Sequence, residues 1–490
     1  MRKNFEQQMT FGQTPIDKIR FDLKCRDEIP KVLLGLQYVY CNKELQQKVF
    51  ETLETVIPEN VNPKMGRPGM DLWKILVMGT VRLSCNWDYD KLHDIVNNHK
   101  KIRQMLGHGT MNDEITYQLQ TLKDNVRLLT PEILDEINKL VVEAGHSLLV
   151  KKNQTLKGRC DSFVVETDVH YPTDINLLFD AVRKIIQLIA VISQDLGLTG
   201  WRQFQYNIRV FKKFYRQVQK LKHSTSKDKD KKAERSQLIE DAHQEYVEAA
   251  EQHIANVKST INAISSDSPR IAGMIMSLEE YIAHAERQID QIRRRVLKGE
   301  KIPHAEKVFS IFEPHTEWIS KGKAGVPQEL GLRVCVLQDQ YGLILHHRVM
   351  EKETDDKVAV CMIACAQKKF PNLRTCSFDK GFYSPANKKE LNAILDFLVL
   401  PKKGKRNKLE QEEERSEEFI KAKRKHSAVE SDINGLENHG LDRCPDHGII
   451  GFKRYVSLAV LARNLQIIGN HIQQKEFKRF QRSQMDKAAA

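Results

Sequence analysis

The chain has 490 residues, and its 78 Lys and Arg outnumber its 65 Asp and Glu, giving a formal net charge of +13 and a pI of about 9.1. A chain of this length is too long for one ordinary hydrophobic core, so two or three structural units are expected. The excess of basic residues favours nucleic acid or an anionic membrane surface as partner. The start lacks the apolar core of a signal peptide, no run reaches the apolar length that a bilayer requires, and the nine cysteines form no CxxC pair, so we expect a cytoplasmic protein with reduced thiols.

The first 150 residues divide at the turn-rich run IPENVNPKMGRPG. Residues 1–60, of mixed composition, are expected to form an N-terminal arm. Apolar residues then recur at helical spacing, as at Leu72, Ile75 and Leu76. This pattern predicts a compact helical domain over residues 61–150.

The predicted helical domain carries basic residues that are candidate contacts to DNA phosphates. They are Lys91, Lys100, Lys101 and Arg103. The plainer alternative is a solvated helix face. Arg67, within Gly-Arg-Pro, is a candidate minor-groove hook, although three residues are weak evidence and a plain linker is the favoured explanation.

The segment GRCDSFVVET, residues 158–167, is rich in β-branched and aromatic residues and predicts a β-strand. Residues 176–299 then show apolar residues three and four apart in four stretches, which predicts a helical insertion that packs as a bundle. The charged run KHSTSKDKDKKAE within the insertion is expected to be a loop.

The pattern changes to short strands after residue 300. GLRVCVLQD and YGLILHHRVM predict a hairpin, and helices and strands alternate after it, with strands at RTCSFD and FLVLP. Together with residues 151–175, residues 300–470 are expected to form an α/β domain with a mixed sheet, in the order of a ribonuclease-H-like fold. The segment FKRYVSLAVLARNLQIIG predicts a helix under the sheet, followed by a mobile basic tail at residues 471–490.

Three carboxylates stand out within these elements. Asp161 lies on the first strand, Asp379 ends a later strand, and Glu430 lies on a helix beside an apolar face. Carboxylates from distant segments can jointly hold two divalent ions for in-line phosphoryl transfer, so we expect two Mg²⁺ ions, for which Mn²⁺ can substitute. Basic neighbours are candidates to offset phosphate charge, or are solvated surface residues: Lys380, Arg424 and Lys425.

Two of the three positions have rivals. Asp168 follows the first strand, but a carboxylate on the strand itself is held more rigidly, which favours Asp161. Glu437 lies two helical turns beyond Glu430 and is otherwise a solvent-facing helix residue.

Three segments resemble the DDE transposases of bacterial insertion sequences, in particular the ISNCY type. They are DSFVVETDVHYPTDINLLFDAVRKI, FDKGFYSPANKKEL and HSAVESDINGLENHGLDRCPDHGIIGFKRYVSLAVLARNLQIIG. The resemblance extends from about Gly66 to Gly469 and favours Asp161 and Glu430 as catalytic, metal-binding residues together with Asp379. It implies a nucleoid-associated enzyme that binds the terminal inverted repeats in double-stranded DNA, cuts there and joins the ends to target DNA. An inactive DNA-binding protein and a metal-dependent nuclease on the same fold are the alternatives.

The chain departs from one pattern among such enzymes. Those that cut through a DNA hairpin carry Tyr, Arg and Lys at fixed offsets around the catalytic Glu, where this chain has Lys423, His426 and Glu437. The sequence therefore gives no support to hairpin resolution and leaves nick-and-join and copy-out routes open.

Two further expectations concern zinc and assembly. His439, Cys444 and His447 lie within nine residues and are candidate zinc ligands, with an ordered loop as the alternative. Because two DNA ends must be joined in concert, we expect a homodimer, with contacts through the apolar face of the Leu72 to Leu83 helix and through the insertion helices. The N-terminal helical domain is the expected reader of the DNA ends.

Overall fold

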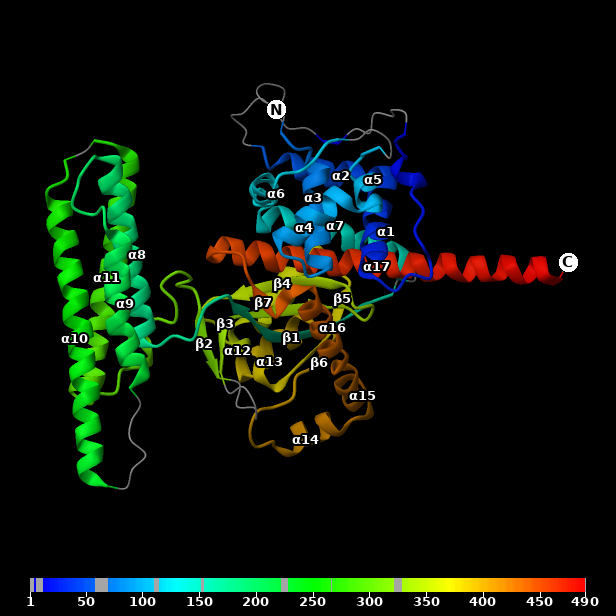
Figure 1. Ribbon diagram of the computed structural model, residues 1–490. Helices are drawn as coiled ribbons and strands as arrows, with labels where there is room; N and C mark the ends of the chain where they lie inside the picture. Colours follow the sequence, from blue (N-terminus) through cyan, green and yellow to red (C-terminus); the bar gives the residue numbers. More distant parts are fainter. Residues whose placement is uncertain are drawn as a thin grey trace. The chain divides into compact units, whose positions relative to one another are not determined.

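The computed structural model describes residues 4–5, 12–57, 69–109, 114–150, 154–221, 228–265, 267–320 and 328–489 (Figure 1). The candidate minor-groove hook at Arg67 lies outside these ranges. The chain divides into two compact units, of which unit 1 comprises residues 1–168 and 319–490 and unit 2 comprises residues 169–318.

Unit 1 is built on a mixed parallel and antiparallel sheet, so its class is α/β, as predicted. The strand order is β2-β3-β1-β5-β6, with β4 paired to β3 and β7 paired to β1. The strands are β1 (Leu156–Thr167), β2 (Glu317–Ser320), β3 (Gln328–Gln338), β4 (Ile344–Met350), β5 (Leu373–Phe378), β6 (Phe397–Val399) and β7 (Arg443–Cys444). β1 runs antiparallel to β3 and parallel to β5, and β5 runs parallel to β6. The predicted hairpin is confirmed as β3 and β4, which pair antiparallel.

Helices cover both faces of this sheet. The N-terminal helices are α1 (Glu28–Cys41), α2 (Lys43–Glu54), α3 (Leu72–Ser84), α4 (Tyr89–Asn98), α5 (Lys100–Met105), α6 (Leu119–Val126) and α7 (Pro131–Leu149). The later ones are α12 (Asp355–Lys369), α13 (Pro385–Ile394), α14 (Lys408–Arg415), α15 (Glu417–His426), α16 (Ala428–Leu436) and α17 (Gly448–Ala489). Alternate residues of β1 serve the two faces: Phe163 and Val165 join the core with α1, α3 and α17, whereas Cys160 joins the core with α12.

The long helix α17 is the central element of unit 1. Figure 1 shows it running between the sheet and the N-terminal helices, and it contacts α1, α3, α7 and β4. The predicted burial of its apolar residues is confirmed, since each of the following is fully buried: Val456, Leu458, Ala459, Val460 and Leu461. The segment expected to be a mobile tail instead continues this helix to Ala489, and the Gln473 amide donates to the carbonyl oxygens of Leu23 and Cys25.

The N-terminal segment is not an arm. The first helix, EIPKVLLGLQYVYC, is apolar on most of its surface, and Val32, Leu33 and Leu36 are fully buried in the core that they share with α17. A helix that is apolar nearly all round must be enclosed, which explains why it lies inside unit 1. The average composition of residues 1–60 is mixed, so it does not indicate the apolar segment within them.

The apolar face of α3 is not a dimer surface. Leu72, Ile75 and Leu76 are each about 1% exposed within the core of their own chain. A side chain that is already buried in the fold has no apolar area left for a partner. The prediction that this helix forms a homodimer contact is therefore wrong.

Unit 2 consists of helices around a core of its own. Its described helices are α8 (Asp174–Asp195), α9 (Phe204–Lys220), α10 (Lys229–Asn262) and α11 (Pro269–Ile292), followed by a π-helical turn at Arg293–Leu297. The expected insertion, residues 176–299, lies within this unit. The charged run was expected to be a loop, but its second part begins α10, because the Asp228 side chain accepts a hydrogen bond from the Asp230 N–H and caps that helix. Among the described residues, no helix is both long and apolar enough to span a bilayer.

Candidate active site

The sheet brings the first two predicted carboxylates side by side. β1 and β5 are parallel neighbours, and Cys160 is paired with Phe378 in their register. Asp161 and Asp379 follow these two residues directly, and Asp379 immediately precedes the short 3-10 helix Lys380–Phe382. Since adjacent parallel strands lie about 4.8 Å apart, the two carboxylates occupy neighbouring positions at one place on the sheet.

The third carboxylate comes from α16, which contacts β1. Val429 and Leu436 are buried and fix this helix against the rest of unit 1, while Glu430, in the first turn, is exposed. The Glu430 N–H donates to the Ser427 carbonyl oxygen at 3.2 Å, which joins α16 to the end of α15. The helix thus holds Glu430 over the face of β1 on which Asp161 lies.

The charges of these groups interact. Burial raises the pKa of Asp161 to about 6, the hydrogen bond that its Oδ1 accepts from the Ser162 N–H at 2.8 Å opposes the rise, and the charges of Asp379, Asp355 and Glu430 add to it. Like charges that crowd one place disfavour ionisation of each other. The site is therefore an acidic cluster in which a cation would be stabilised.

Asp355 is a fourth carboxylate that the sequence did not indicate. It is the first residue of α12, where an acidic residue is ordinarily explained by the helix dipole. In the structure the Ser162 hydroxyl donates to Asp355 Oδ1 at 2.6 Å, and a Cβ atom at Gly381 would lie 3.1 Å from Asp355 Oδ2. Asp355 thus lies against Ser162, which follows Asp161 on β1, and against Gly381, two residues after Asp379.

His426, four residues before Glu430, lies beside the cluster on the α15 side. Its Nδ1 is 3.0 Å from the buried Ser377 hydroxyl on β5, and its Nε2 is buried without a hydrogen-bond partner in the described part of the chain. Burial lowers the pKa of His426, Asp379 and Glu430 act to raise it, and Arg159 acts to lower it. Arg159 shares the face of β1 with Asp161, a relation visible in the period-two pattern of the strand.

The two rival carboxylates lie elsewhere. Asp168 follows the far end of β1, exposed and 3.7 Å from Arg443, and seven extended residues place it ~23 Å from Asp161 along the chain. Glu437 is exposed in the π-helical segment after α16, ~10 Å of helix beyond Glu430. The groups that chiefly raise the pKa of Asp161, beside its burial, are instead Asp379, Asp355 and Glu430.

The predicted basic contacts fall into two groups. Lys380, Arg424 and Lys425 are exposed near the cluster and make no ion pair with any described residue. On the N-terminal helices, Lys100 is exposed and Lys101 half-buried, but Lys91 pairs with Asp94 at 3.3 Å. The Arg103 guanidinium donates to the Ile115 carbonyl oxygen at 3.1 Å, so it holds a loop of its own chain.

His439, one of the candidate zinc ligands, is held by hydrogen bonds within the fold. The two ring nitrogens of His439 each lie 2.8 Å from an oxygen, Nδ1 from the Ser84 carbonyl and Nε2 from the Gln466 side chain, so neither is available to a metal. The loop after Cys444 is ordered by Asp446, which pairs with the buried Arg82 at 2.9 Å. Among the described residues, no three His, Cys, Asp or Glu side chains are grouped to hold a metal ion as they stand.

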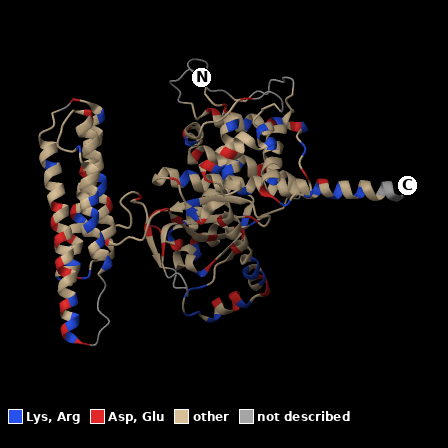
Figure 2. Ribbon diagram, viewed as in Figure 1, with Lys and Arg blue, Asp and Glu red and all other residues tan. Residues whose placement is uncertain are grey.

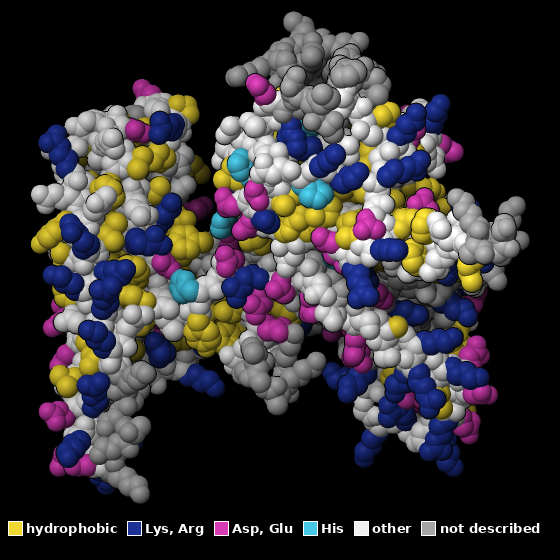
Figure 3. Space-filling view, turned by 45° about the vertical axis from the view of Figure 1, so that its right-hand side comes forward, with side chains coloured by type: hydrophobic (Ala, Val, Ile, Leu, Met, Phe, Trp, Pro, Cys, Tyr) yellow, Lys and Arg dark blue, Asp and Glu magenta, His cyan; other side chains and the backbone are white. Residues whose placement is uncertain are grey.

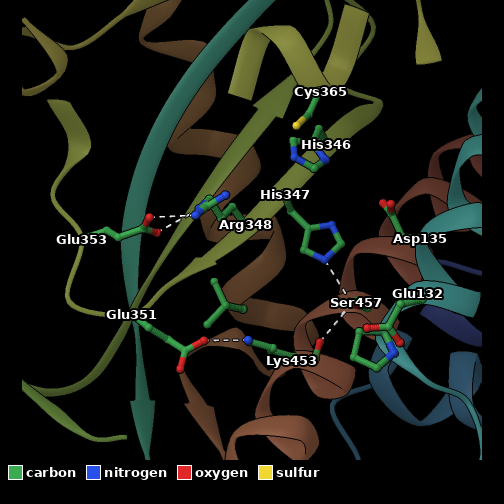
Figure 4. Close-up of a pocket in the computed structure, with 12 residues that line it drawn as sticks. Glu132, Asp135, His346, His347, Arg348, Glu351, Glu353, Cys365, Lys453 and Ser457 are labelled. Atoms are coloured by element: carbon green, nitrogen blue, oxygen red, sulfur yellow. Dashed lines mark hydrogen bonds and ion pairs between the residues drawn. The ribbon is translucent and has the colours of Figure 1, made fainter. Parts of the chain in front are cut away.

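A separate polar pocket of about 500 Å³ lies beside the edge strand β4 (Figure 4). Burial lowers the pKa of His346 to about 3 and that of His347 to about 4, and His347 Nε2 lies 3.1 Å from the Ser457 hydroxyl. The charged groups around them pair with each other, as Lys453 does with Glu351 at 2.6 Å. This pocket shares no lining residue with the carboxylate cluster.

Comparison with protein-family models, curated proteins and solved structures gave no match to this chain.

Proposed function

We propose that this protein is a DDE-type DNA transposase that cuts and joins DNA strands at the carboxylate cluster. The observation that carries the proposal is the convergence of Asp161, Asp379 and Glu430 from two adjacent strands and a late helix, close enough for the last two to raise the pKa of the first. A carboxylate with a perturbed pKa beside other carboxylates is typical of catalytic sites, and carboxylate groups that hold divalent ions carry out phosphoryl transfer.

The topology supports a ribonuclease-H-like fold for this domain. Across the sheet, β4, β3 and β1 are antiparallel neighbours, and β5 and β6 extend the sheet in parallel from β1. The first carboxylate lies on the central strand β1, and the second follows its parallel neighbour. This is the arrangement expected from the order of strands in the sequence.

The donor set of the cluster suits a hard divalent cation such as Mg²⁺, with Mn²⁺ as substitute. Asp161, Asp379 and Glu430 would hold it, and the exposed side chains of Asp379 and Glu430 would turn toward Asp161 to do so. When bound, the ions supply charge stabilisation for the attacking and leaving oxygens of an in-line displacement. Burial is the main cause of the raised pKa of Asp161, and repulsion from Asp379, Asp355 and Glu430 adds to it; such a cation would relieve that repulsion.

The surrounding residues have separate roles in this proposal. The exposed cations Lys380, Arg424 and Lys425 bind phosphate oxygens of the DNA backbone beside the carboxylates. Asp355 accepts a hydrogen bond from the Ser162 hydroxyl and so fixes the backbone next to Asp161. His426, anchored on Ser377, fixes the end of α15 from which Glu430 is presented.

The test is an assay that separates binding, nicking and joining. The full chain is incubated with Mg²⁺ and labelled duplexes that carry the ends of the DNA element encoding it, with scrambled duplexes as control. We expect nicks at the element ends and joining of the freed 3′ ends to a target plasmid. Nicking without joining indicates a nuclease, binding alone indicates an inactive DNA-binding protein, and either outcome contradicts the proposal.

A further inference from the structure

Helix α9 of unit 2 carries a row of exposed basic side chains. Its members are Arg209, Lys212, Lys213, Arg216 and Lys220, all exposed. Their spacing of three and four residues places them on one side of the helix. From the first to the last, the helix rises ~16 Å, so the row is a straight line of positive charge. Figure 2 shows the basic residues of this unit, and Figure 3 shows Lys and Arg gathered on its visible face.

The charge of this row is uncompensated. None of the five side chains makes an ion pair with a described residue, and residues 196–227 contain no Asp or Glu. Several basic residues elsewhere in the same unit are paired, as Lys258 is with Glu286 at 2.6 Å and Arg293 with Glu251 at 2.8 Å. Unit 2 therefore leaves the cations of α9 without the acidic partners that it provides on its other helices.

The opposite face of α9 packs against the core of the bundle. Phe211 is about 1% exposed and stacks on Tyr246 with ring centroids 5.0 Å apart, and Tyr215 stacks on Phe179 at 4.6 Å. An amphipathic helix that binds a lipid surface must bury its apolar face in the membrane. Because the apolar face of α9 is already buried in protein, a lipid surface is disfavoured as the partner.

We propose that the row on α9 binds the phosphate backbone of duplex DNA. DNA presents one negative charge per ~1.7 Å of its axis, so ~16 Å of helix faces several phosphates. The row is flanked by exposed Tyr206, Gln217 and Gln219, whose hydroxyl and amide groups can donate to phosphate oxygens. This inference rests on the proposed function, because DNA is the polyanion on which the carboxylate cluster acts, and it adds a sequence-independent binding surface remote in sequence from that cluster.

The experiment measures binding of the full chain to a fluorescein-labelled 30-bp duplex of arbitrary sequence, by anisotropy, in EDTA and over a KCl series. The test variant combines Arg209→Gln, Lys213→Gln and Arg216→Gln, and the matched control combines Lys258→Gln, Arg270→Gln and Arg293→Gln, which removes the same charge from paired residues of the same unit. We expect the test variant to bind at least about tenfold more weakly at 100 mM KCl, with a log–log salt slope smaller by about 2–3, and the control to change affinity less than about twofold.

Two additional arms keep the result decisive. A variant with Arg209→Lys and Arg216→Lys keeps the charge and should bind as the wild type does, and thermal melts by circular dichroism show whether each variant is folded. Equal loss in the test and control variants, unchanged binding in the test variant, or binding of the wild type to phosphatidylserine-containing vesicles but not to duplex would each overturn the inference. Nicking by the wild type in Mg²⁺ is measured separately. If the α9 substitutions leave DNA binding unchanged but the wild type nicks DNA, only this inference is rejected. If DNA binding depends on α9 but the wild type does not nick DNA, only the proposed function is rejected.

Discussion

At the scale of single residues, the protein concentrates negative charge at the expense of stability. Asp161 is partly buried, and its pKa is raised to about 6 by that burial and by the neighbouring Asp379, Asp355 and Glu430. Ionisation of Asp161 therefore costs more free energy in the folded chain than in the unfolded chain. Functional sites commonly carry such a cost because the arrangement that suits the reaction is not the most stable one.

This cost gives a pH-dependent prediction for Asp161→Asn. Below the unfolded pKa, near 4, the aspartate is neutral in both states, so the variant and the wild type should be equally stable. As the pH rises from about 4 to about 6, the wild type loses up to about 2–3 kcal/mol of stability that the variant keeps. Melting in EDTA should therefore show the variant more stable than the wild type at pH 7.5 and equal to it near pH 4.

Addition of Mg²⁺ at pH 7.5 should raise the melting temperature of the wild type and leave that of Asp161→Asn nearly unchanged, since the cation offsets the repulsion only where the carboxylate is present. A stability difference between the two proteins that is the same at pH 4 and pH 7.5 would contradict the assigned surroundings of Asp161.

Only some residues of the carboxylate cluster could be predicted from the sequence alone. Asp161, Asp379 and Glu430 could be selected because strand ends and a helix with one apolar face are visible in the pattern of residues. Asp355 and Ser377 could not, because their relevance depends on which strand lies beside which, and on the hydrogen bonds to Ser162 and His426. The zinc hypothesis failed for a similar reason, since the partners of His439 come from α3 and α17.

At the scale of elements, the close contact of α1 and α17 determines how the N-terminal helices meet the rest of unit 1. A Cβ atom added at Gly35 would clash with the Leu465 carbonyl oxygen, and one at Gly469 would clash with the Lys31 carbonyl oxygen. The two glycines therefore let the helix backbones approach each other. Such a contact is invisible in the apolar periodicity of either helix.

Gly35→Ala should destabilise unit 1 by about 1–3 kcal/mol, because the added methyl group has no space and the helices must separate. The matched control is Gly273→Ala on α11, where the added Cβ has no neighbour within 4 Å and alanine should stabilise the helix by about 0.5–1 kcal/mol. Urea denaturation followed by circular dichroism measures both changes. A Gly35→Ala protein as stable as the wild type would show that the helices do not meet at this point.

Strands and helices of the α/β part were predictable because each has its own periodicity and boundary signals. The hairpin β3–β4 and the strands β5 and β6 occur where alternation and turn residues indicate them. The arm and the tail were misjudged because α1 is apolar nearly all round and the later part of α17 is polar nearly all round, so neither shows the one-sided pattern of an amphipathic helix.

At the scale of the whole molecule, the N-terminal helices and the sheet form one structure through α17. A chain that begins near residue 150 would expose the face of α17 that α1, α3 and α7 cover. We therefore expect this truncation to lose cooperative unfolding and to aggregate, as judged by circular dichroism and gel filtration. A truncated chain that is monomeric and melts cooperatively would contradict the shared core.

Recognition of DNA ends by the N-terminal helices is therefore better tested in the full chain. Lys100→Gln and Lys101→Gln change exposed or half-buried cations without removing core residues. If these helices read the DNA ends, the substitutions should weaken binding to cognate and scrambled duplexes by different factors, whereas equal weakening would indicate phosphate contacts alone.

The central claim is that Asp161, Asp379 and Glu430 together hold the divalent ions of a DNA-cutting site. The most direct measurement is titration with Mn²⁺, followed by the electron paramagnetic resonance signal of the free ion in the absence of DNA. The wild type should bind Mn²⁺. Binding should be weakened at least about tenfold by each of Asp161→Asn, Asp379→Asn and Glu430→Gln. The variants Asp168→Asn and Glu437→Gln should bind Mn²⁺ as the wild type does. Mn²⁺ binding that is unchanged by the first three substitutions, or that is lost with either of the last two, would contradict the account.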